Sequence, residues 1–527
     1  MASKTTPYSI AQTVRDRAVE YGTEPVFSFK GDELSYSSLD ENSNRSANGL
    51  LAHGLEKGDR IAFLGKNSPV YFELIAAVSK TQTVITPINW RLAGPELVYV
   101  LNDCHAKLIF ADAEYCEALS KLQSSLIFNP VLICVQQSVD GTQSYTQWQN
   151  GFSSTDPALD ESADDEVVQL YTSGTTGKPK GAILSDRTLL ALRGQEDDDI
   201  MQDWQLYAAG ETALLAMPCF HVGGTSFGLG IIHSGAHAVI IPEYDPNEVL
   251  TLIEKYQVSK IFMVPAALKI ILDSPRIDEA DLSSLEYIFY GASPIPLDLM
   301  RESIDRFGCG FVQMYGMNES GGTIVALPPE DHDPQGNEKM RSVGKALWGV
   351  ELKIIDEQGN TLSPGLIGEI ATRSAKNMKS YWNLPEATKE ALDDDGWLRT
   401  GDAGYLDEQG YLYIHDRVKD MIISGGENVY PAEVENAIYS HSSVSDVAVI
   451  GVPDSKWGEA IKAFVVLKPG VDQDAQAIID FTRTQIASYK CPKTVEYIDV
   501  LPRNPSGKVL RRELREPFWE GKRRAVN

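Results

Sequence analysis

The chain has 527 residues, of which 43% are hydrophobic and 23% charged, a composition typical of a globular protein large enough to divide into domains. Its 47 basic and 74 acidic side chains give a net charge of −27, which disfavours nucleic acid or an anionic membrane surface as a partner. The six cysteines lie far apart without a CxxC pair, which argues against a zinc site or a disulfide framework and fits a reducing cytosol.

Neither terminus carries a recognisable targeting signal. Residues 1–7 lack the apolar core of a signal peptide, and the final residues are not a peroxisomal signal. No uncharged apolar run is long enough to cross a bilayer. We therefore expect a cytoplasmic protein.

The first part of the chain alternates between helix-like and strand-like stretches. Residues 39–55 have apolar side chains at helical spacing, residues 60–64 indicate a buried strand, and residues 72–79 indicate another helix. This alternation predicts a mostly parallel sheet covered by helices. An acidic stretch, residues 156–166, indicates a solvated connector.

A loop rich in glycine and hydroxyl groups follows the apolar run 167–171. Residues 171–181 are YTSGTTGKPKG. Glycines let a backbone approach a ligand closely, successive amide groups form an anion site, and hydroxyls and lysines add donors and charge. The spacing differs from the common ATPase loop, which needs a glycine at 172 and a hydroxyl at 179. The loop suits a polyphosphate, although its composition alone fits an ordinary surface loop equally well.

This loop resembles the signature loop of the adenylate-forming superfamily, which includes acyl-CoA synthetases, aryl-CoA ligases, firefly luciferase and the adenylation domains of peptide synthetases. The resemblance implies that the loop binds ATP. The implied nucleotide ligands here are Thr172, Ser173, Gly174, Thr175, Thr176, Gly177, Lys178 and Lys180.

Residues 217–224, MPCFHVGG, resemble the family segment in which an aromatic residue or histidine lines the carboxylate pocket and gates thiol entry. His221 takes that position, although a lone histidine on an apolar stretch is more often a core residue. Residues 216–230 contain no Asp or Glu, whereas adenylation domains for amino acids place an acid there. An apolar acid is therefore expected. The implied acyl pocket comprises His221, Val222, Gly223, Gly291 and Ala292.

Residues 287–294 indicate a strand that ends in the small residues Gly291, Ala292 and Ser293, against which a flat ring can pack. They resemble the family's Gly-Gly-Ala-Pro segment at the adenine and acyl pocket. Ala292 replaces the second glycine, and its methyl group is expected to narrow the acyl channel.

Residues 311–320 repeat this pattern and contain a variant of the family motif Tyr-Gly-x-Thr-Glu. The resemblance implies that Tyr315 stacks on adenine beside Gly316, and that Glu319 holds Mg²⁺ together with Thr172. Asn318 stands where the family usually has Thr, and its amide is expected to donate to the α-phosphate.

Residues 397–402, WLRTGD, resemble the family's Tyr-Arg-Thr-Gly-Asp, which implies that Asp402 accepts both ribose hydroxyls. Two near-identical DEQG sequences, at 356–359 and 407–410, predict hairpin turns with glycine at positive φ.

The segment 416–435 is a second strong match. The resemblance implies that Arg417 binds ribose, that Lys419 is the hinge, and that Gly425, Gly426 and Glu427 face CoA. Later strand-like runs and an amphipathic helix at 475–486 indicate a compact α+β unit.

Near the end, residues 502–511 resemble the family's terminal Gly-Lys motif. The resemblance implies that Lys508 bridges the substrate carboxylate and the α-phosphate of ATP. With His221 and Glu319, Lys508 completes the expected catalytic set.

The family resemblance spans 171–508. It implies an α/β fold with a large N-terminal α/β domain of packed sheets and helices (1–416), a hinge (417–419) and a small mobile C-terminal α+β domain (420–527). The closest resemblance is to bacterial fatty-acyl-CoA ligases. The implied reaction joins an acid to CoA through acyl-AMP, with ATP and Mg²⁺.

A medium- or long-chain fatty acid is the expected substrate, with an aryl, cinnamyl or sterol-side-chain acid as the alternative. A ligase that loads a carrier protein and a luciferase-like oxygenase also remain open. A non-catalytic binding protein is disfavoured because Lys508 and Glu319 are both present. The oligomeric state is left open, with a homodimer among the options.

Overall fold

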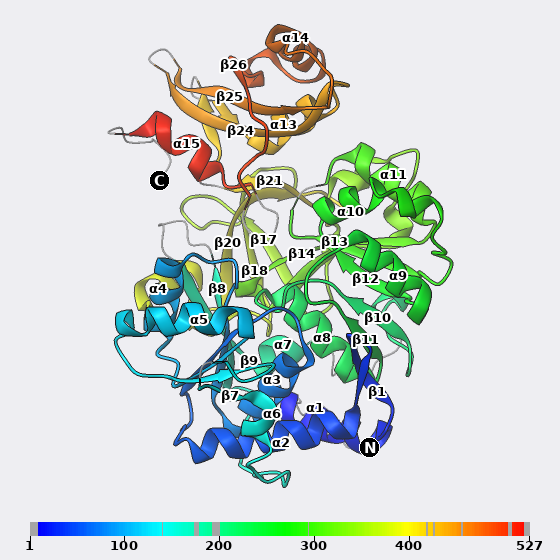
Figure 1. The fold of residues 1–527 in the computed structure, drawn as a ribbon. Coiled ribbons are helices and arrows are strands. Elements are labelled where there is room, and N and C mark those ends of the chain that lie inside the picture. Colours follow the sequence, from blue (N-terminus) through cyan, green and yellow to red (C-terminus); the bar gives the residue numbers. More distant parts are fainter. Residues whose placement is uncertain are drawn as a thin grey trace.

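The computed structural model describes most of the chain. The described residues are 9–139, 141–172, 179–191, 201–293, 295–417, 420–424, 427–454, 457–503 and 509–520. Figure 1 shows a large lower part built around two broad sheets, and a smaller part above it that holds the orange and red end of the chain.

An eight-stranded sheet carries the hairpin that flanks the signature loop. Its strands are β3 Arg60–Leu64, β4 Val84–Pro87, β5 Leu108–Ala111, β6 Val131–Cys134, β7 Gln143–Ser144, β8 Glu166–Thr172, β9 Lys180–Ser185 and β19 Ser380–Tyr381. They lie in the order β19-β9-β8-β4-β3-β5-β6-β7. Strands β3 to β8 pair in parallel, whereas β9 runs antiparallel to β8 and β19 antiparallel to β9. The late strand β19 therefore joins a distant part of the chain to the signature hairpin.

A nine-stranded sheet carries the remaining nucleotide motifs of the large part. Its strands are β1 Pro25–Phe29, β2 Asp32–Ser35, β10 Thr212–Leu215, β11 His237–Ile240, β12 Lys260–Met263, β13 Tyr287–Gly291, β14 Gly310–Met317, β15 Gly322–Leu327 and β16 Lys345–Ala346. They lie in the order β16-β15-β14-β13-β12-β10-β11-β1-β2. The strands from β14 to β1 in this order are parallel, so their carboxyl ends meet at one edge, where ligands commonly bind.

Twelve named helices accompany these two sheets in the described part of the chain. They are α1 Ile10–Tyr21, α2 Tyr36–Ala52, α3 Pro69–Thr81, α4 Gly94–Cys104, α5 Ala113–Leu122, α6 Tyr145–Gln149, α7 Asp186–Leu190, α8 Val222–Ser234, α9 Pro246–Tyr256, α10 Pro265–Leu272, α11 Leu297–Phe307 and α12 Pro385–Ala391.

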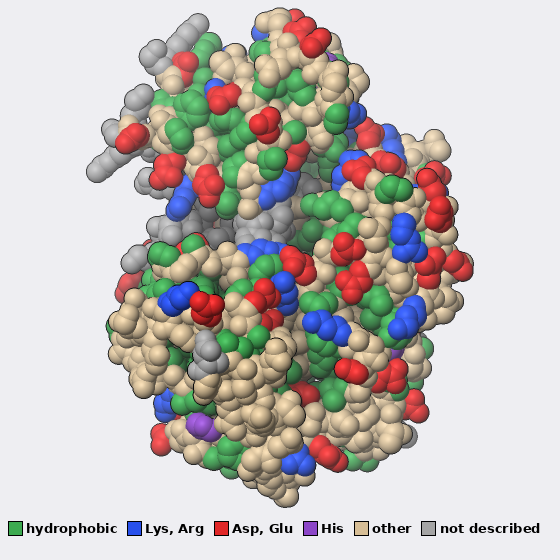
Figure 2. All heavy atoms as spheres, viewed as in Figure 1, with side chains coloured by type: hydrophobic (Ala, Val, Ile, Leu, Met, Phe, Trp, Pro, Cys, Tyr) green, Lys and Arg blue, Asp and Glu red, His purple; other side chains and the backbone are tan. Residues whose placement is uncertain are grey.

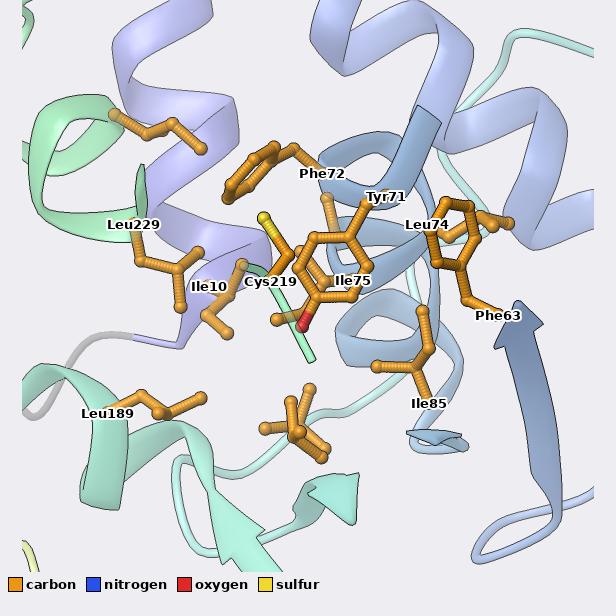
Figure 3. Close-up of a cluster of buried hydrophobic side chains, with 14 of the residues drawn as sticks. Ile10, Phe63, Tyr71, Phe72, Leu74, Ile75, Ile85, Leu189, Cys219 and Leu229 are labelled. Atoms are coloured by element: carbon orange, nitrogen blue, oxygen red, sulfur yellow. The ribbon is translucent and has the colours of Figure 1, made fainter. Parts of the chain in front are cut away.

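The largest apolar cluster contains residues of both sheets together with α3 and α8. Figure 3 shows Tyr71, Phe72 and Ile75 of α3 in this cluster, with Ile10 between them and Leu229 of α8 at the left. A Cβ atom at Gly228 of α8 would lie 2.3 Å from Cζ of Phe72, so only glycine fits there. This packing fixes the position of α8, whose first residues belong to the predicted acyl pocket.

Two smaller sheets complete the fold. The first, in the order β17-β18-β20-β21, is antiparallel and consists of β17 Glu351–Ile355, β18 Gly368–Arg373, β20 Trp397–Leu406 and β21 Leu412–Arg417. The second forms the upper part of Figure 1 and consists of β22 Ile422–Ser424, β23 Glu427–Val429, β24 Val444–Asp454, β25 Gly458–Leu467 and β26 Thr494–Tyr497. It is accompanied by α13 Pro431–Tyr439, α14 Ala475–Gln485 and α15 Arg511–Trp519.

The expected fold class is confirmed, with a large N-terminal α/β part followed by a small C-terminal α+β part. Within the described ranges, no helix combines the length and apolar character needed to span a membrane.

Candidate active site

The signature loop is flanked by the hairpin of β8 and β9. Thr172 and Lys180 are paired residues of the two strands, so the residues on either side of the loop lie next to each other. The Thr172 hydroxyl lies 3.5 Å from the Lys180 carbonyl oxygen, and Nζ of Lys180 lies 4.9 Å from the ring centroid of Tyr381. The predicted ligands between them, Ser173 to Lys178, lie outside the described residues.

The end of β13 forms a tight backbone contact with β14. A Cβ atom at Gly291 would lie 2.1 Å from the carbonyl oxygen of Met314, so a side chain is excluded there. Ala292 follows with a φ of 66°, a left-handed conformation that glycine adopts at lower cost. Ser293 comes next, so the three predicted residues lie at the carboxyl end of a parallel strand, as expected.

Tyr315 and Asp402 come from different sheets and contact each other directly. The hydroxyl of Tyr315, on β14, donates to Oδ2 of Asp402, on β20, across 2.7 Å. Asp402 pairs in register with Arg417 on β21, which places the backbones of the two predicted ribose ligands side by side. The structure therefore brings the predicted adenine and ribose residues together.

Asn318 links the nucleotide motif to the predicted acyl pocket. It lies in the short 3₁₀ turn Asn318–Ser320, and its Oδ1 accepts a hydrogen bond of 3.1 Å from the backbone N–H of Val222. This N–H is the first of α8, and His221 is the N-cap residue of the same helix. The side chain of His221 does not cap α8, so Asn318 supplies an acceptor from another element. The predicted hydrogen bond from the Asn318 amide nitrogen to the α-phosphate stays a prediction.

Glu319 is 6% exposed and is held from two directions. Its Oε1 accepts a 3.0 Å hydrogen bond from the Tyr381 hydroxyl, and its backbone oxygen accepts a 2.7 Å bond from the N–H of Met378. Among the described residues, no group donates to Oε2. A buried carboxylate with one oxygen left over is a suitable ligand for a hard cation such as Mg²⁺.

Two titratable groups near predicted site residues have raised pKa values. Burial and the charge of Asp402 raise the pKa of Glu369, whose Oε1 accepts a 3.2 Å hydrogen bond from the N–H of Gly401. Burial also raises the pKa of the Cys219 thiol, two residues before His221, so this thiol stays protonated at neutral pH.

Several predicted residues are placed by their backbone alone or lie beyond the described ranges. Arg417 and Glu427 belong to β21 and β23. The others lie outside the described residues, and they are Ser173, Gly174, Thr175, Thr176, Gly177, Lys178, Lys419, Gly425, Gly426 and Lys508. Their roles stay predictions.

Tyr381 contacts two residues of the predicted site, although no sequence motif marks it. It contacts Glu319 and Lys180, yet it lies on the two-residue strand β19, which has no periodicity to identify it. Figure 2 shows that both basic and acidic side chains flank the region where the C-terminal part meets the rest of the molecule.

Comparison with known proteins gives consistent matches along the whole chain. The model of the AMP-binding enzyme family matches residues 14–382, and the model of the AMP-binding enzyme C-terminal domain matches residues 433–508. The chain is 39% identical over 520 residues to a fatty acid–acyl-carrier-protein ligase, ScoC, of Streptomyces coeruleorubidus, covering 98% of each chain.

It is also 37% identical over 491 residues to a feruloyl-CoA synthase of an Amycolatopsis species, covering 93% of this chain and 94% of the relative. Among solved structures, ATP-bound MatB of Rhodopseudomonas palustris is 31% identical and superposes with a TM-score of 0.86, covering 97% of this chain and 98% of MatB. The chain therefore belongs to the AMP-binding enzyme family, within the adenylate-forming acyl-CoA synthetases, and is an AMP-forming acid–thiol ligase.

Proposed function

We propose that the protein activates a hydrophobic carboxylic acid with Mg·ATP and transfers the acyl group to CoA, with a medium- or long-chain fatty acid as the first candidate. The observation that carries this proposal is the hydrogen bond between Asn318 and Val222. This bond joins Asn318 of residues 311–320 to Val222 of the predicted acyl pocket, which supports a site where an acid and the α-phosphate of ATP meet. Residues 216–230 contain no acidic side chain, in keeping with an apolar acid.

In the first step, a carboxylate oxygen attacks the α-phosphorus of ATP and pyrophosphate leaves, which yields acyl-AMP. Tyr315 stacks on adenine, and Asp402 accepts the ribose hydroxyls. Glu319 and Thr172 would hold Mg²⁺, which would supply positive charge beside the phosphates. Lys508 stabilises the charge that develops at the α-phosphate, and its loss is expected to lower the rate about 10²–10³-fold.

In the second step, the thiol sulfur attacks the acyl carbonyl carbon and AMP leaves, while the thiol proton is released. The domains 1–416 and 420–527 reorient about Lys419 between the two steps, so that one site serves both reactions. Support comes from the topology, because β21 closes one sheet at Arg417 and β22 starts a separate sheet at Ile422. The rings of His415, on β21, and Tyr430, which follows β23, contact each other across the boundary between these two sheets, with centroids 4.8 Å apart.

Two alternatives are favoured by particular relatives. The similarity to ScoC favours a carrier protein as the thiol acceptor, and the similarity to a feruloyl-CoA synthase favours an aryl acid. Both alternatives use the same adenylation chemistry and differ only in the acid or the thiol.

The decisive experiment combines fatty, aryl and sterol-side-chain acids with Mg·ATP and either CoA or a carrier protein bearing its phosphopantetheine arm. Mass spectrometry of the thioesters and quantification of AMP identify both acid and acceptor, and Lys508→Ala serves as the inactive control. Acyl-CoA formed from fatty acids supports the proposal. A thioester formed only on the carrier protein would replace CoA as the acceptor, and no AMP with any acid would overturn the adenylation reaction.

A further inference from the structure

We propose that Tyr381 is a positioning residue that couples the signature loop to the metal-binding carboxylate. Its hydroxyl orients Glu319, and its ring supports Lys180. The inference rests on the proposed function, because it assigns Glu319 to Mg²⁺ and Lys180 to the phosphates of ATP.

The contact with Glu319 restricts the carboxylate to one orientation. The Tyr381 hydroxyl donates to Oε1 across 3.0 Å, while the Met378 N–H holds the Glu319 backbone oxygen at 2.7 Å. Because Oε1 already accepts this hydrogen bond and the side chain is buried, we expect Oε2 to be the oxygen that binds a cation. A hydrogen bond that orients a metal ligand in this way commonly changes metal affinity by about 10–100-fold.

The contact with Lys180 connects the same ring to the signature hairpin. Nζ of Lys180 lies 4.9 Å from the Tyr381 ring centroid, a cation–π contact. The backbone of Tyr381 pairs with Ala182, two residues after Lys180. One side chain therefore touches both a predicted phosphate ligand and the predicted metal ligand.

The next residue anchors this segment rigidly. The Trp382 N–H donates to the Gly181 oxygen across 2.7 Å, and its indole Nε1 donates to the Asp103 oxygen across 2.9 Å. The guanidinium of Arg60 stacks on the indole with its Cζ 3.4 Å from the ring centroid, and is paired with Glu166 at 2.8 Å. These contacts hold the backbone beside Tyr381 in place before any ligand binds, so ordering this segment costs little conformational entropy on binding.

Tyr381→Phe separates the two contacts, because it removes the hydroxyl and keeps the ring under Lys180. We expect the dissociation constant of Mg·ATP, measured by isothermal titration calorimetry, to rise about tenfold, while that of ATP in EDTA stays unchanged. Tyr381→Leu removes both contacts and should weaken the binding of ATP in EDTA as well. Tyr244→Phe is the matched control, because the Tyr244 hydroxyl donates to the Ala267 oxygen at 2.8 Å, away from the predicted ligands, and should leave both constants unchanged.

Thioester formation from preformed acyl-AMP, which consumes no ATP, should proceed at the wild-type rate in Tyr381→Phe. Equal Mg·ATP affinity in Tyr381→Phe and the wild-type protein would overturn the inference, as would an equal loss of affinity with and without magnesium. Failure of the wild-type protein itself to bind Mg·ATP would instead overturn the proposed function, so the two failures are distinguishable.

Discussion

The hydroxyl of Tyr315 donates a hydrogen bond of 2.7 Å to Oδ2 of Asp402, although 87 positions separate the two residues. The bond joins the end of β14 in the nine-stranded sheet to β20 in the four-stranded antiparallel sheet. It orients the carboxylate that is predicted to accept the ribose hydroxyls. A contact between two sheets therefore joins two residues of the predicted nucleotide site.

Tyr315→Phe should weaken ATP binding without changing the acid preference. It keeps the ring for stacking on adenine and removes the bond to Asp402, whose net contribution is on the order of 1 kcal/mol. We expect the KM for ATP to rise by about three- to tenfold, and the KM for the acid to stay constant. Steady-state kinetics with each substrate varied in turn test this, and an unchanged KM for ATP would show that Asp402 needs no orientation by Tyr315.

Asn318→Ala should destabilise the protein, because it leaves the buried N–H of Val222 without its acceptor. A lost cap of this kind costs about 1–2 kcal/mol. The thermal unfolding midpoint of Asn318→Ala should fall below that of the wild-type protein, whereas Asn318→Asp, which retains an acceptor oxygen, should fall less. Equal midpoints for Asn318→Ala and the wild-type protein would show that the hydrogen bond has no net effect.

Ala292→Gly should be tolerated or stabilising. The left-handed φ of 66° costs an alanine about 1–2 kcal/mol, which outweighs the gain in unfolded-state entropy of up to about 1 kcal/mol that glycine brings. Ala371→Gly is the control, because Ala371 is a buried residue of β18 without positive φ and should be destabilised by the same change. A fall in the unfolding midpoint of both variants alike would contradict the strain at Ala292.

Ala292→Gly also tests the acyl channel. If the methyl group narrows the channel, the variant should accept bulkier or longer acids with a higher kcat/KM relative to the wild-type protein. An unchanged profile over the same acid panel would place the methyl group outside the channel.

Individual helices and turns could be predicted because the residues that specify them lie within the element itself. Helical spacing at 39–55 and 475–486 is confirmed as α2 and α14, and the two DEQG turns contain Gly359 and Gly410 with φ values of 85° and 82°. Long periodic runs and glycine turns carry their own structural information.

Contacts between distant elements could not be predicted in this way. Asn318 caps a helix 96 positions earlier in the chain, and Tyr381 reaches Glu319 through a two-residue strand. Neither contact has a spacing rule, because both depend on how the sheets pack. The predicted site residues were therefore identifiable by motif, whereas the residues that orient them became visible only in three dimensions.

His332 should make the protein less stable as the pH falls below neutrality. Its Nδ1 lies 2.9 Å from the Pro328 oxygen and its Nε2 lies 3.0 Å from the Tyr290 hydroxyl. Burial lowers its pKa from 6.5 to about 4, although the hydrogen bond to the Pro328 oxygen and the charge of the Asp331 carboxylate act in the opposite direction. The unfolded chain therefore takes up a proton more readily than the folded protein between these two values.

The contribution of neutral His332 to the free energy of unfolding is fully present above pH 6.5. It is lost as the pH falls toward 4, by on the order of 3 kcal/mol. Between about pH 7 and about pH 5, the unfolding midpoint should fall less in His332→Gln than in the wild-type protein, because glutamine cannot titrate. Identical pH profiles for the two proteins would contradict a buried neutral histidine.

The most direct test of the central claim is acid-dependent exchange of labelled pyrophosphate into ATP, measured without any thiol. Formation of acyl-AMP is reversible, so label should enter ATP only when magnesium and a suitable acid are present. Glu319→Gln and Lys508→Ala should each lower the exchange, the latter by about 10²–10³-fold. Absence of exchange with every acid of the panel, or formation of ADP and phosphate in place of AMP and pyrophosphate, would contradict adenylation at this site.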